Sequence, residues 1–212
     1  MSQPASTVFI VDDDASVLKG LSRLLRSARL NPVTFSSPKE FLDGYDPHTA
    51  CCLILDVAMP GLDGLELQQA LAAKGCQTPI IFLTGHGDIP MSVRAIKRGA
   101  VDFLTKPVHD EDLLKAVHSA IRADLANRKV LAGLDDIRQR LVSLTPRERE
   151  VLEHVVMGQL NKQIAGDMGI VEQTIKVHRG RMMEKMKVQS VAELVHLAER
   201  VGLLGDKPPS RH

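Results

Sequence analysis

Short apolar runs alternate with longer amphipathic stretches over the first 121 residues. Five runs have the length and composition of buried strands: residues 8–11, 33–35, 52–55, 79–83 and 101–104. Between them, apolar residues recur at the three- and four-residue spacing of helices with one buried face. Alternating strands and helices predict βαβ units, and continuous apolar strands predict a parallel sheet covered on both faces. We expect an α/β first domain over residues 1–121, with a five-stranded doubly wound parallel sheet.

A charged stretch separates this pattern from the rest of the chain. Over residues 122–143 the pattern loosens, and Leu134, Ile137 and Leu141 follow one another at spacings of three and four residues. That spacing is typical of a helix, whereas Gly133 favours an interruption. We predict a largely helical linker with a break near Gly133.

Three signals for the start of a helix coincide just after this linker. Thr145 can act as an N-cap, Pro146 takes the first helical position, and Glu148 completes a capping box. We therefore expect a small all-α domain of four helices over residues 144–204. The helices are predicted at residues 146–157, 161–168, 172–186 and 190–200. Residues 205–212 are predicted to form a disordered tail.

Two of these helices are predicted to form a helix-turn-helix. Ile164 and Ile175 are apolar where the helices would pack, Ala165 is small where they would cross, and Gly169 stands where a tight turn needs a positive φ. Residues 173–187 hold five basic residues and one acidic residue. Such a stripe is typical of a helix that enters the DNA major groove. A solvated basic face would explain the charges, but not the alanine and glycine spacing.

Composition and charge narrow the class of protein. Of the 212 residues, 44% are hydrophobic and 25% charged, the balance of a globular chain with a core. The formal net charge of +1 hides a division, because residues 1–121 hold 11 Lys and Arg against 14 Asp and Glu, and residues 122–212 hold 16 against 12. A basic second half favours nucleic-acid binding. Without an apolar run of about 18 residues or a secretory signal, we expect a cytoplasmic protein that binds no membrane.

Chemistry-bearing residues follow four of the five predicted strands. Asp12 and Asp13 come after the first run, Asp56 after the third, Thr84 after the fourth and Lys106 after the fifth. In a doubly wound sheet ligands bind at the carboxyl ends of the strands, so these side chains should meet. Clustered carboxylates repel one another unless a cation neutralises them, and their hard oxygens suit Mg²⁺. The implied chemistry is phosphoryl transfer onto a carboxylate, assisted by the metal and a lysine.

Two nearby residues have simpler explanations. Asp14 is expected to cap the helix that follows it. His86 is expected to be a surface or interface residue of a loop rather than a catalytic one.

This constellation resembles the receiver domains of two-component response regulators. The matching motifs are Val11-Asp12-Asp13, Asp56-Val57-Ala58-Met59-Pro60-Gly61, Leu83-Thr84-Gly85-His86 and Lys106-Pro107. The resemblance covers residues 7–122 and implies a flavodoxin-like fold in which Asp56 is the phosphoacceptor. The implied ligands of Mg²⁺ are Asp12, Asp13, Asp56 and the backbone carbonyl of Ala58.

The same resemblance implies a switch beside the phosphate. Lys106 would contact the phosphate, the Thr84 hydroxyl would move toward it, and Phe103 would follow as an apolar rotamer switch. Receiver domains of this kind form dimers through the face of the fourth helix and fifth strand. On that face the resemblance places Val93, Ile96, Lys97 and Phe103, so phosphorylation would bring two DNA-binding domains onto two half-sites.

The second domain resembles the four-helix DNA-binding domain of the LuxR type. The match covers residues 144–203 and rests on Leu144-Thr145-Pro146-Arg147-Glu148-Arg149-Glu150-Val151-Leu152, Asn161-Lys162-Gln163-Ile164-Ala165 and Thr174-Ile175-Lys176-Val177-His178. By resemblance, the residues that face bases are Lys176, Val177 and Gly180. The implied phosphate contacts are Lys162, Thr174, Arg179 and Lys185. Gly180 departs from members with a long polar side chain there, which removes one base-reading group and costs helix propensity by roughly 1 kcal/mol against alanine.

Both halves together resemble the FixJ subfamily of response regulators, in which the stretch Gly85-His86-Gly87-Asp88-Ile89-Pro90-Met91 is also typical. The implied function is phosphorylation-dependent control of transcription, usually activation. The implied partners are a sensor histidine kinase, operator DNA, RNA polymerase and a second copy of the chain. A phosphatase that uses Asp56 as a transient nucleophile is disfavoured, because the sequence shows no second acid placed to activate water and no substrate cap. A constitutive DNA-binding protein is disfavoured by the intact acidic site.

Overall fold

The computed structural model describes residues 6–46, 51–85 and 89–203. The chain divides into two compact units, residues 1–128 and 129–212. Helix α5 (Asp110–Val142) contributes residues to both units. Among the described residues, no helix is long and apolar enough to cross a membrane.

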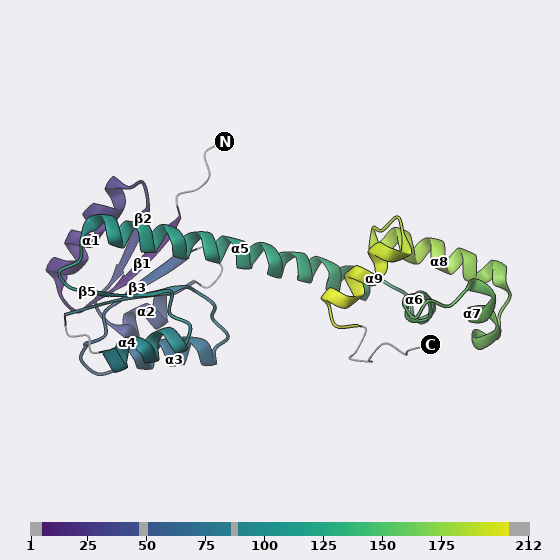
Figure 1. The fold of residues 1–212 in the computed structure, drawn as a ribbon, viewed down its shortest axis with the longest axis horizontal. Coiled ribbons are helices and arrows are strands. Elements are labelled where there is room, and N and C mark those ends of the chain that lie inside the picture. The colour runs from purple at the N-terminus through teal and green to yellow at the C-terminus, as the bar shows by residue number, and fades with distance from the viewer. Residues whose placement is uncertain (1–5, 47–50, 86–88, 204–212) are drawn as a thin grey trace. The chain divides into compact units, whose positions relative to one another are not determined.

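The first unit is a five-stranded parallel sheet with helices on both faces (Figure 1). The strands are β1 (Thr7–Val11), β2 (Asn31–Phe35), β3 (Cys51–Leu55), β4 (Ile80–Thr84) and β5 (Asp102–Thr105), in the order β2-β1-β3-β4-β5. Helices α1 (Ala15–Ser27) and α5 cover one face, and helices α2 (Pro38–Gly44), α3 (Gly64–Ala73) and α4 (Ile89–Lys97) cover the other. The predicted doubly wound α/β fold is confirmed.

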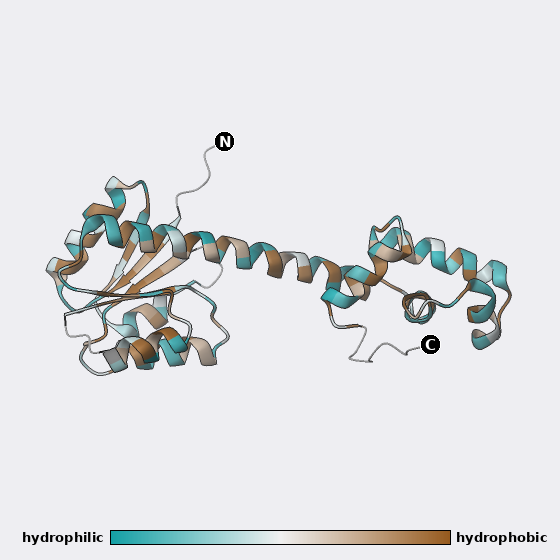
Figure 2. Ribbon diagram, in the orientation of Figure 1, coloured by the Kyte–Doolittle hydropathy of each residue, from teal (hydrophilic) through white to brown (hydrophobic). Residues whose placement is uncertain are grey.

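The apolar strand runs are explained by burial on both faces of the sheet. In β1, Val8 and Ile10 pack against α1 and α5, whereas Phe9 and Val11 pack toward α2 and α3. In Figure 2 the strands in the middle of the sheet are mostly brown, the colour of hydrophobic residues. Pro32 lies in the edge strand β2, where a residue without an N–H leaves the sheet intact.

Helix α2 is short, and the continuity of α5 differs from the sequence-based prediction. Helix α2 has seven residues, too few to show a helical period, and Ser37 caps it by accepting from the Glu40 N–H. The break predicted near Gly133 is wrong, because α5 runs without interruption to Val142. A helical glycine costs only about 1 kcal/mol against alanine. Ile137, one turn further along, is buried in the core of the second unit, and its packing outweighs that cost.

The second unit consists of the end of α5 and four further helices. These are α6 (Pro146–Val156), α7 (Asn161–Met168), α8 (Glu172–Met186) and α9 (Val191–Arg200). Thr145 caps α6 with Pro146 in its first turn and Glu148 in a capping box, as predicted. Gly169 ends α7 with a φ of 65°, which confirms the predicted turn between α7 and α8. The predicted tail, residues 205–212, lies outside the described residues.

Candidate functional site: the acidic site and the basic helix

Three of the predicted site residues meet at the carboxyl edge of the sheet. The Lys106 ammonium Nζ lies 2.6 Å from Asp12 Oδ2 and 2.8 Å from Asp56 Oδ1. Asp12 is 2% exposed and Asp56 5% exposed, whereas the Lys106 side chain is partly open to solvent. One lysine therefore bridges two buried carboxylates.

Strand register brings these residues together. Val11 pairs with Leu55 across β1 and β3, so the residues that follow each of them emerge at the same level. The Asp56 N–H donates to the carbonyl of Val11 at 2.9 Å, which ties the two strand ends. The Lys106 N–H donates to the carbonyl of Thr84 at 2.7 Å, and the Lys106–Pro107 peptide bond is cis.

Burial and ion pairing act in opposite directions on the charges of this site. Burial raises the pKa of Asp12 above its usual value, against the hydrogen bonds that it accepts from Lys106 and the Asp14 N–H. Desolvation acts to lower the pKa of Lys106, but its hydrogen bonds to Asp12 and Asp56 raise that pKa overall. The ammonium therefore stays charged at neutral pH and partly neutralises the carboxylates.

The raised pKa of Asp12 predicts the effect of neutralising this residue. A carboxyl whose pKa is raised by folding stabilises the protein at low pH, and that contribution is lost as the pH rises through the folded pKa. Asp12→Asn should therefore raise the free energy of unfolding of the first unit at pH 7, with a gain that shrinks toward pH 4. Urea unfolding without divalent cations measures it.

Asp14→Asn is the matched control for this measurement. Asp14 is exposed and caps α1, and its hydrogen bonds from the Ser16 hydroxyl and N–H lower its pKa. That substitution should slightly lower the free energy of unfolding at pH 7. A lower free energy of unfolding in Asp12→Asn at neutral pH would contradict the desolvation argument.

The basic helix α8 presents the residues that were predicted to face bases. Lys176 and Val177 are exposed, and the Lys176 ammonium lies 3.2 Å from the Glu172 carboxylate one turn earlier. Gly180 is also exposed, and no atom outside its own helix backbone lies within 4 Å of the position that a Cβ would take. On the opposite side, Ile175 is fully buried. Helix α8 thus has one face in the core and one face available to a ligand.

The residues predicted to contact phosphates have different surroundings. Lys162 is exposed in the first turn of α7, and Thr174 is half-buried in the first turn of α8. Arg179 donates from Nη1 to Asn161 Oδ1 at 2.7 Å. The ammonium of Lys185, the fourth of these residues, donates to Glu148 Oε2 at 2.6 Å inside the domain.

Comparison with known protein families identifies both halves of the chain. The model of the "Response regulator receiver domain" matches residues 8–118, and that of "Bacterial regulatory proteins, luxR family" matches residues 142–198. The chain belongs to the two-component response regulators. Its second unit is a LuxR-type DNA-binding domain, so this response regulator is a transcription regulator and not an enzyme, with a histidine kinase and DNA as its partners.

Individual relatives match over nearly the whole response regulator. The "Response regulator protein TodT" of Pseudomonas putida is 47% identical over 201 residues, which cover 95% of this chain and 88% of that protein. The "Transcriptional regulatory protein FixJ" of Bradyrhizobium diazoefficiens is 43% identical over 199 residues, covering 94% and 97%. The solved structure of the "Response Regulator StyR" is 47% identical, covers 92% of this chain and 99% of that one, and superposes with a TM-score of 0.86.

The acidic site of the response regulator has the donor chemistry of a Mg²⁺ site, but not a carboxylate cage. Asp13 is exposed beside buried Asp12, and Ala58 is exposed in the loop after β3. Within the described ranges, no three His, Cys, Asp or Glu side chains are placed together to hold a metal ion. Three carboxylates against one ammonium nevertheless leave a negative charge that a divalent cation would neutralise. Carboxylate and carbonyl oxygens are ligands that suit Mg²⁺.

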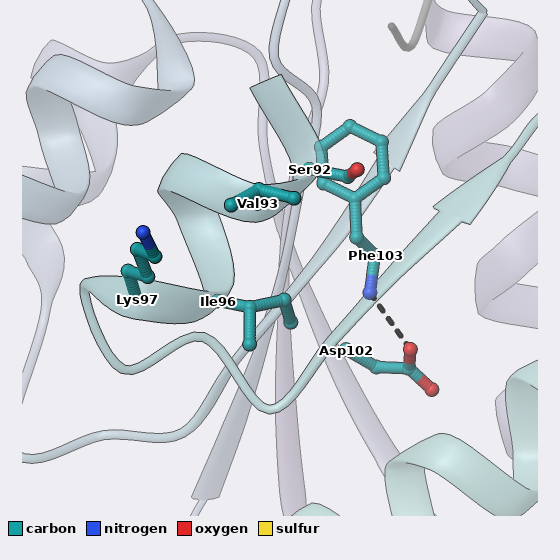
Figure 3. Close-up of a pocket in the computed structure, with 6 residues that line it drawn as sticks. All are labelled: Ser92, Val93, Ile96, Lys97, Asp102 and Phe103. Carbon is teal, nitrogen blue, oxygen red and sulfur yellow. Dashed lines mark hydrogen bonds between the residues drawn. The ribbon is translucent and has the colours of Figure 1, made fainter. Parts of the chain in front are cut away.

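Phe103 and the predicted dimer residues line one groove of the receiver domain. The groove has a volume of about 460 Å³ and is lined by Ser92, Val93, Ile96, Lys97, Asp102 and Phe103 (Figure 3). Val93 is 44% exposed and Ile96 46% exposed. Phe103 is partly buried, and its ring centroid lies 6.0 Å from that of Phe82. Thr84, the predicted hydroxyl of the switch, is fully buried at the end of β4.

Sequence reasoning missed the role of Glu148 beyond its capping box. Its side chain is 4% exposed, and hydrogen bonds from Lys185 and the Thr145 N–H lower its pKa. The two partners Glu148 and Lys185 are 37 residues apart in the chain. No local pattern connects them, because the contact depends on how α6 packs against α8.

Proposed function

We propose that Asp56 accepts a phosphoryl group from a sensor histidine kinase, and that this phosphorylation promotes dimerisation and binding to operator DNA. The observation that carries the proposal is the buried Asp56 carboxylate with the Lys106 ammonium at 2.8 Å. In the transfer, an Asp56 oxygen forms a bond to phosphorus as the histidine nitrogen of the kinase leaves. A lysine beside the attacking oxygen stabilises the charge of the transferring group.

The metal is assigned to the same edge of the sheet. Asp12, Asp13, Asp56 and the Ala58 carbonyl would hold Mg²⁺, which when bound neutralises the negative charge of the phosphoryl group. With Mg²⁺ bound, Asp12 would be a ligand of the metal, and the Lys106 ammonium would donate to a phosphate oxygen.

The switch follows from the added charge. A phosphate brings about −1.5 to −2 charges and three strong acceptors to the strand ends. The Thr84 hydroxyl is proposed to turn toward a phosphate oxygen, and Phe103 to move into the space that this leaves. Because Phe103 lines the groove beside α4, its movement changes the surface that carries Val93 and Ile96. This surface is the proposed dimer interface.

A charge in the groove should block the dimer. The mass of the unmodified response regulator should double in light scattering after addition of acetyl phosphate and Mg²⁺, whereas Val93→Glu should stay monomeric, because a dimer would bury the new carboxylate without a partner. Val142→Glu, at an exposed valine in α5 outside the groove, is the matched control and should still dimerise. A constant mass of the unmodified protein, with increased DNA binding, would show that the dimer is not part of the mechanism.

The exposed face of α8 is proposed to read the operator. Lys176, Val177 and Gly180 are assigned to base edges, and Lys162, Thr174 and Arg179 to phosphates. As a DNA-binding regulator the protein is proposed to work in the cytoplasm, and bound dimers are proposed to recruit RNA polymerase as an activator.

Lys176→Ala should reduce sequence discrimination. The probes are a duplex that the unmodified protein selects from a random-sequence pool and a scrambled duplex of the same composition. Loss of a good base contact should lower the preference for the selected duplex by roughly 1–3 kcal/mol. Lys162→Ala should instead weaken both duplexes alike and reduce the salt slope by about one. Unchanged preference in Lys176→Ala would indicate that α8 enters the groove with a different rotation.

A further inference from the structure

Two side chains, Lys185 and Arg140, hold the C-terminal end of α8 through three hydrogen bonds. The Lys185 ammonium donates to Glu148 Oε2 at 2.6 Å and to the Ser143 carbonyl at 3.1 Å. Arg140 donates from Nη1 to the carbonyl of Met186, the last residue of α8, at 3.0 Å. All three partners of α8 belong to residues 140–148, the segment that leads from α5 into α6.

The contact with Glu148 is a half-buried ion pair, in which the carboxylate is the buried partner. The Glu148 side chain is 4% exposed and that of Lys185 35% exposed. The same carboxylate oxygen, Oε2, also accepts from the Thr145 N–H at 2.9 Å. A buried charge that loses its partner costs far more free energy than an exposed ion pair contributes. If Lys185 moved onto a DNA phosphate, the Glu148 carboxylate would be a buried charge without its ion-pair partner. This free-energy cost favours the observed contact between Lys185 and Glu148.

The length of α8 makes its C-terminal anchor important for its other end. Lys185 lies nine positions after Lys176, about 13.5 Å along the axis at 1.5 Å per residue. If the end at Lys185 is fixed differently and the helix tilts by about 5°, Lys176 moves by about 1 Å, since a helix tilts as a rigid rod. Hydrogen bonds to base edges depend on donor and acceptor distances that such a shift would break.

We propose that Lys185 is a positioning residue of DNA recognition, which acts with Glu148 to set the angle of α8 in the groove and makes no contact with DNA phosphate. Arg140 supports the same end of the helix by satisfying the Met186 carbonyl. The inference rests on the proposed reading of bases by α8. It assigns to the start of α6 a part in DNA specificity, although α6 itself carries none of the base-facing residues.

The test compares the selected and scrambled duplexes, with full-length protein treated with acetyl phosphate and Mg²⁺. Lys185→Met and Glu148→Gln should each reduce the preference for the selected duplex by roughly tenfold, within the range expected for the loss of one base contact. The salt slope should stay unchanged in both, because no phosphate contact is lost. Lys185→Arg should retain most of the preference, because its guanidinium can also donate to Glu148.

The opposite pattern overturns the inference. If Lys185 contacts phosphate, Lys185→Met weakens both duplexes alike and lowers the salt slope by about one, while Glu148→Gln keeps its preference. The double variant Lys185→Met/Glu148→Gln guards against misfolding, because it leaves no buried charge without a partner. It should unfold cooperatively in urea and still lack the preference. A folded double variant with full preference would also overturn the inference, whereas failure of the unmodified protein to select any duplex would overturn the proposed function itself.

Discussion

Asp56→Asn is expected to abolish phosphorylation of the response regulator. The substitution keeps the size of the side chain but removes the anionic oxygen that would attack phosphorus. Intact-mass spectrometry after treatment with acetyl phosphate and Mg²⁺ should show one added phosphoryl group on the unmodified protein and none on the variant. Asp112→Asn, at an exposed carboxylate in the first turn of α5, is the matched control and should be labelled like the unmodified protein.

Phosphorylation of Asp56 is also expected to require a divalent cation. Without a divalent cation, the unmodified protein should remain unlabelled, because the charge of the acidic site repels the phosphodonor. Equal labelling of Asp56→Asn, or full labelling in the presence of a chelator, would remove Asp56 or Mg²⁺ from the mechanism.

Gly64→Ala is expected to disturb the acidic site by displacing the backbone at Asp56. A Cβ on Gly64, the first residue of α3, would lie 2.2 Å from the backbone oxygen of Asp56 and 3.0 Å from the Cα of Val57. Backbone atoms have no rotamer by which to escape, so α3 or the Asp56 loop has to move. We expect the free energy of unfolding to fall by about 3 kcal/mol, at the upper end of overpacking costs. The rate of phosphorylation should fall with it.

Gly20→Ala is the control for this substitution. Gly20 lies within α1, and no atom outside the local helix backbone lies within 4 Å of the position of its Cβ. Alanine should therefore raise the free energy of unfolding by up to about 1 kcal/mol through helix propensity. Urea unfolding of both variants provides the comparison. If Gly64→Ala lowers the free energy of unfolding by less than about 1 kcal/mol, the loop after Asp56 accommodates the Cβ without strain.

The acidic site was predictable because each of its residues follows an apolar strand run. Parallel strands bring their carboxyl ends to one edge, so the order of Asp12, Asp56 and Lys106 along the chain already implied that they meet. The sequence did not predict that Lys106 bridges both carboxylates. That geometry depends on distances of 2.6 and 2.8 Å between side chains from three separate strand ends.

In the second unit, too, the features that depend on neighbouring residues were predictable and those that depend on tertiary packing were not. Caps and turns such as Thr145 and Gly169 are local signals, and the four predicted helices agree with the observed ones to within one residue at each end. Two features depend on packing instead. Helix α5 continues through Gly133 because Ile137 and the residues beyond it are buried, and Lys185 lies on Glu148 because α6 crosses α8.

The central claim is that phosphorylation of Asp56 controls DNA binding. The most direct test is footprinting of the unmodified protein and Asp56→Asn on genomic DNA, each with and without acetyl phosphate and Mg²⁺. We predict that discrete protected sites appear at the lowest protein concentration only for the unmodified protein with the phosphodonor. Identical protection of the same sites by Asp56→Asn, with or without the phosphodonor, would contradict the claim.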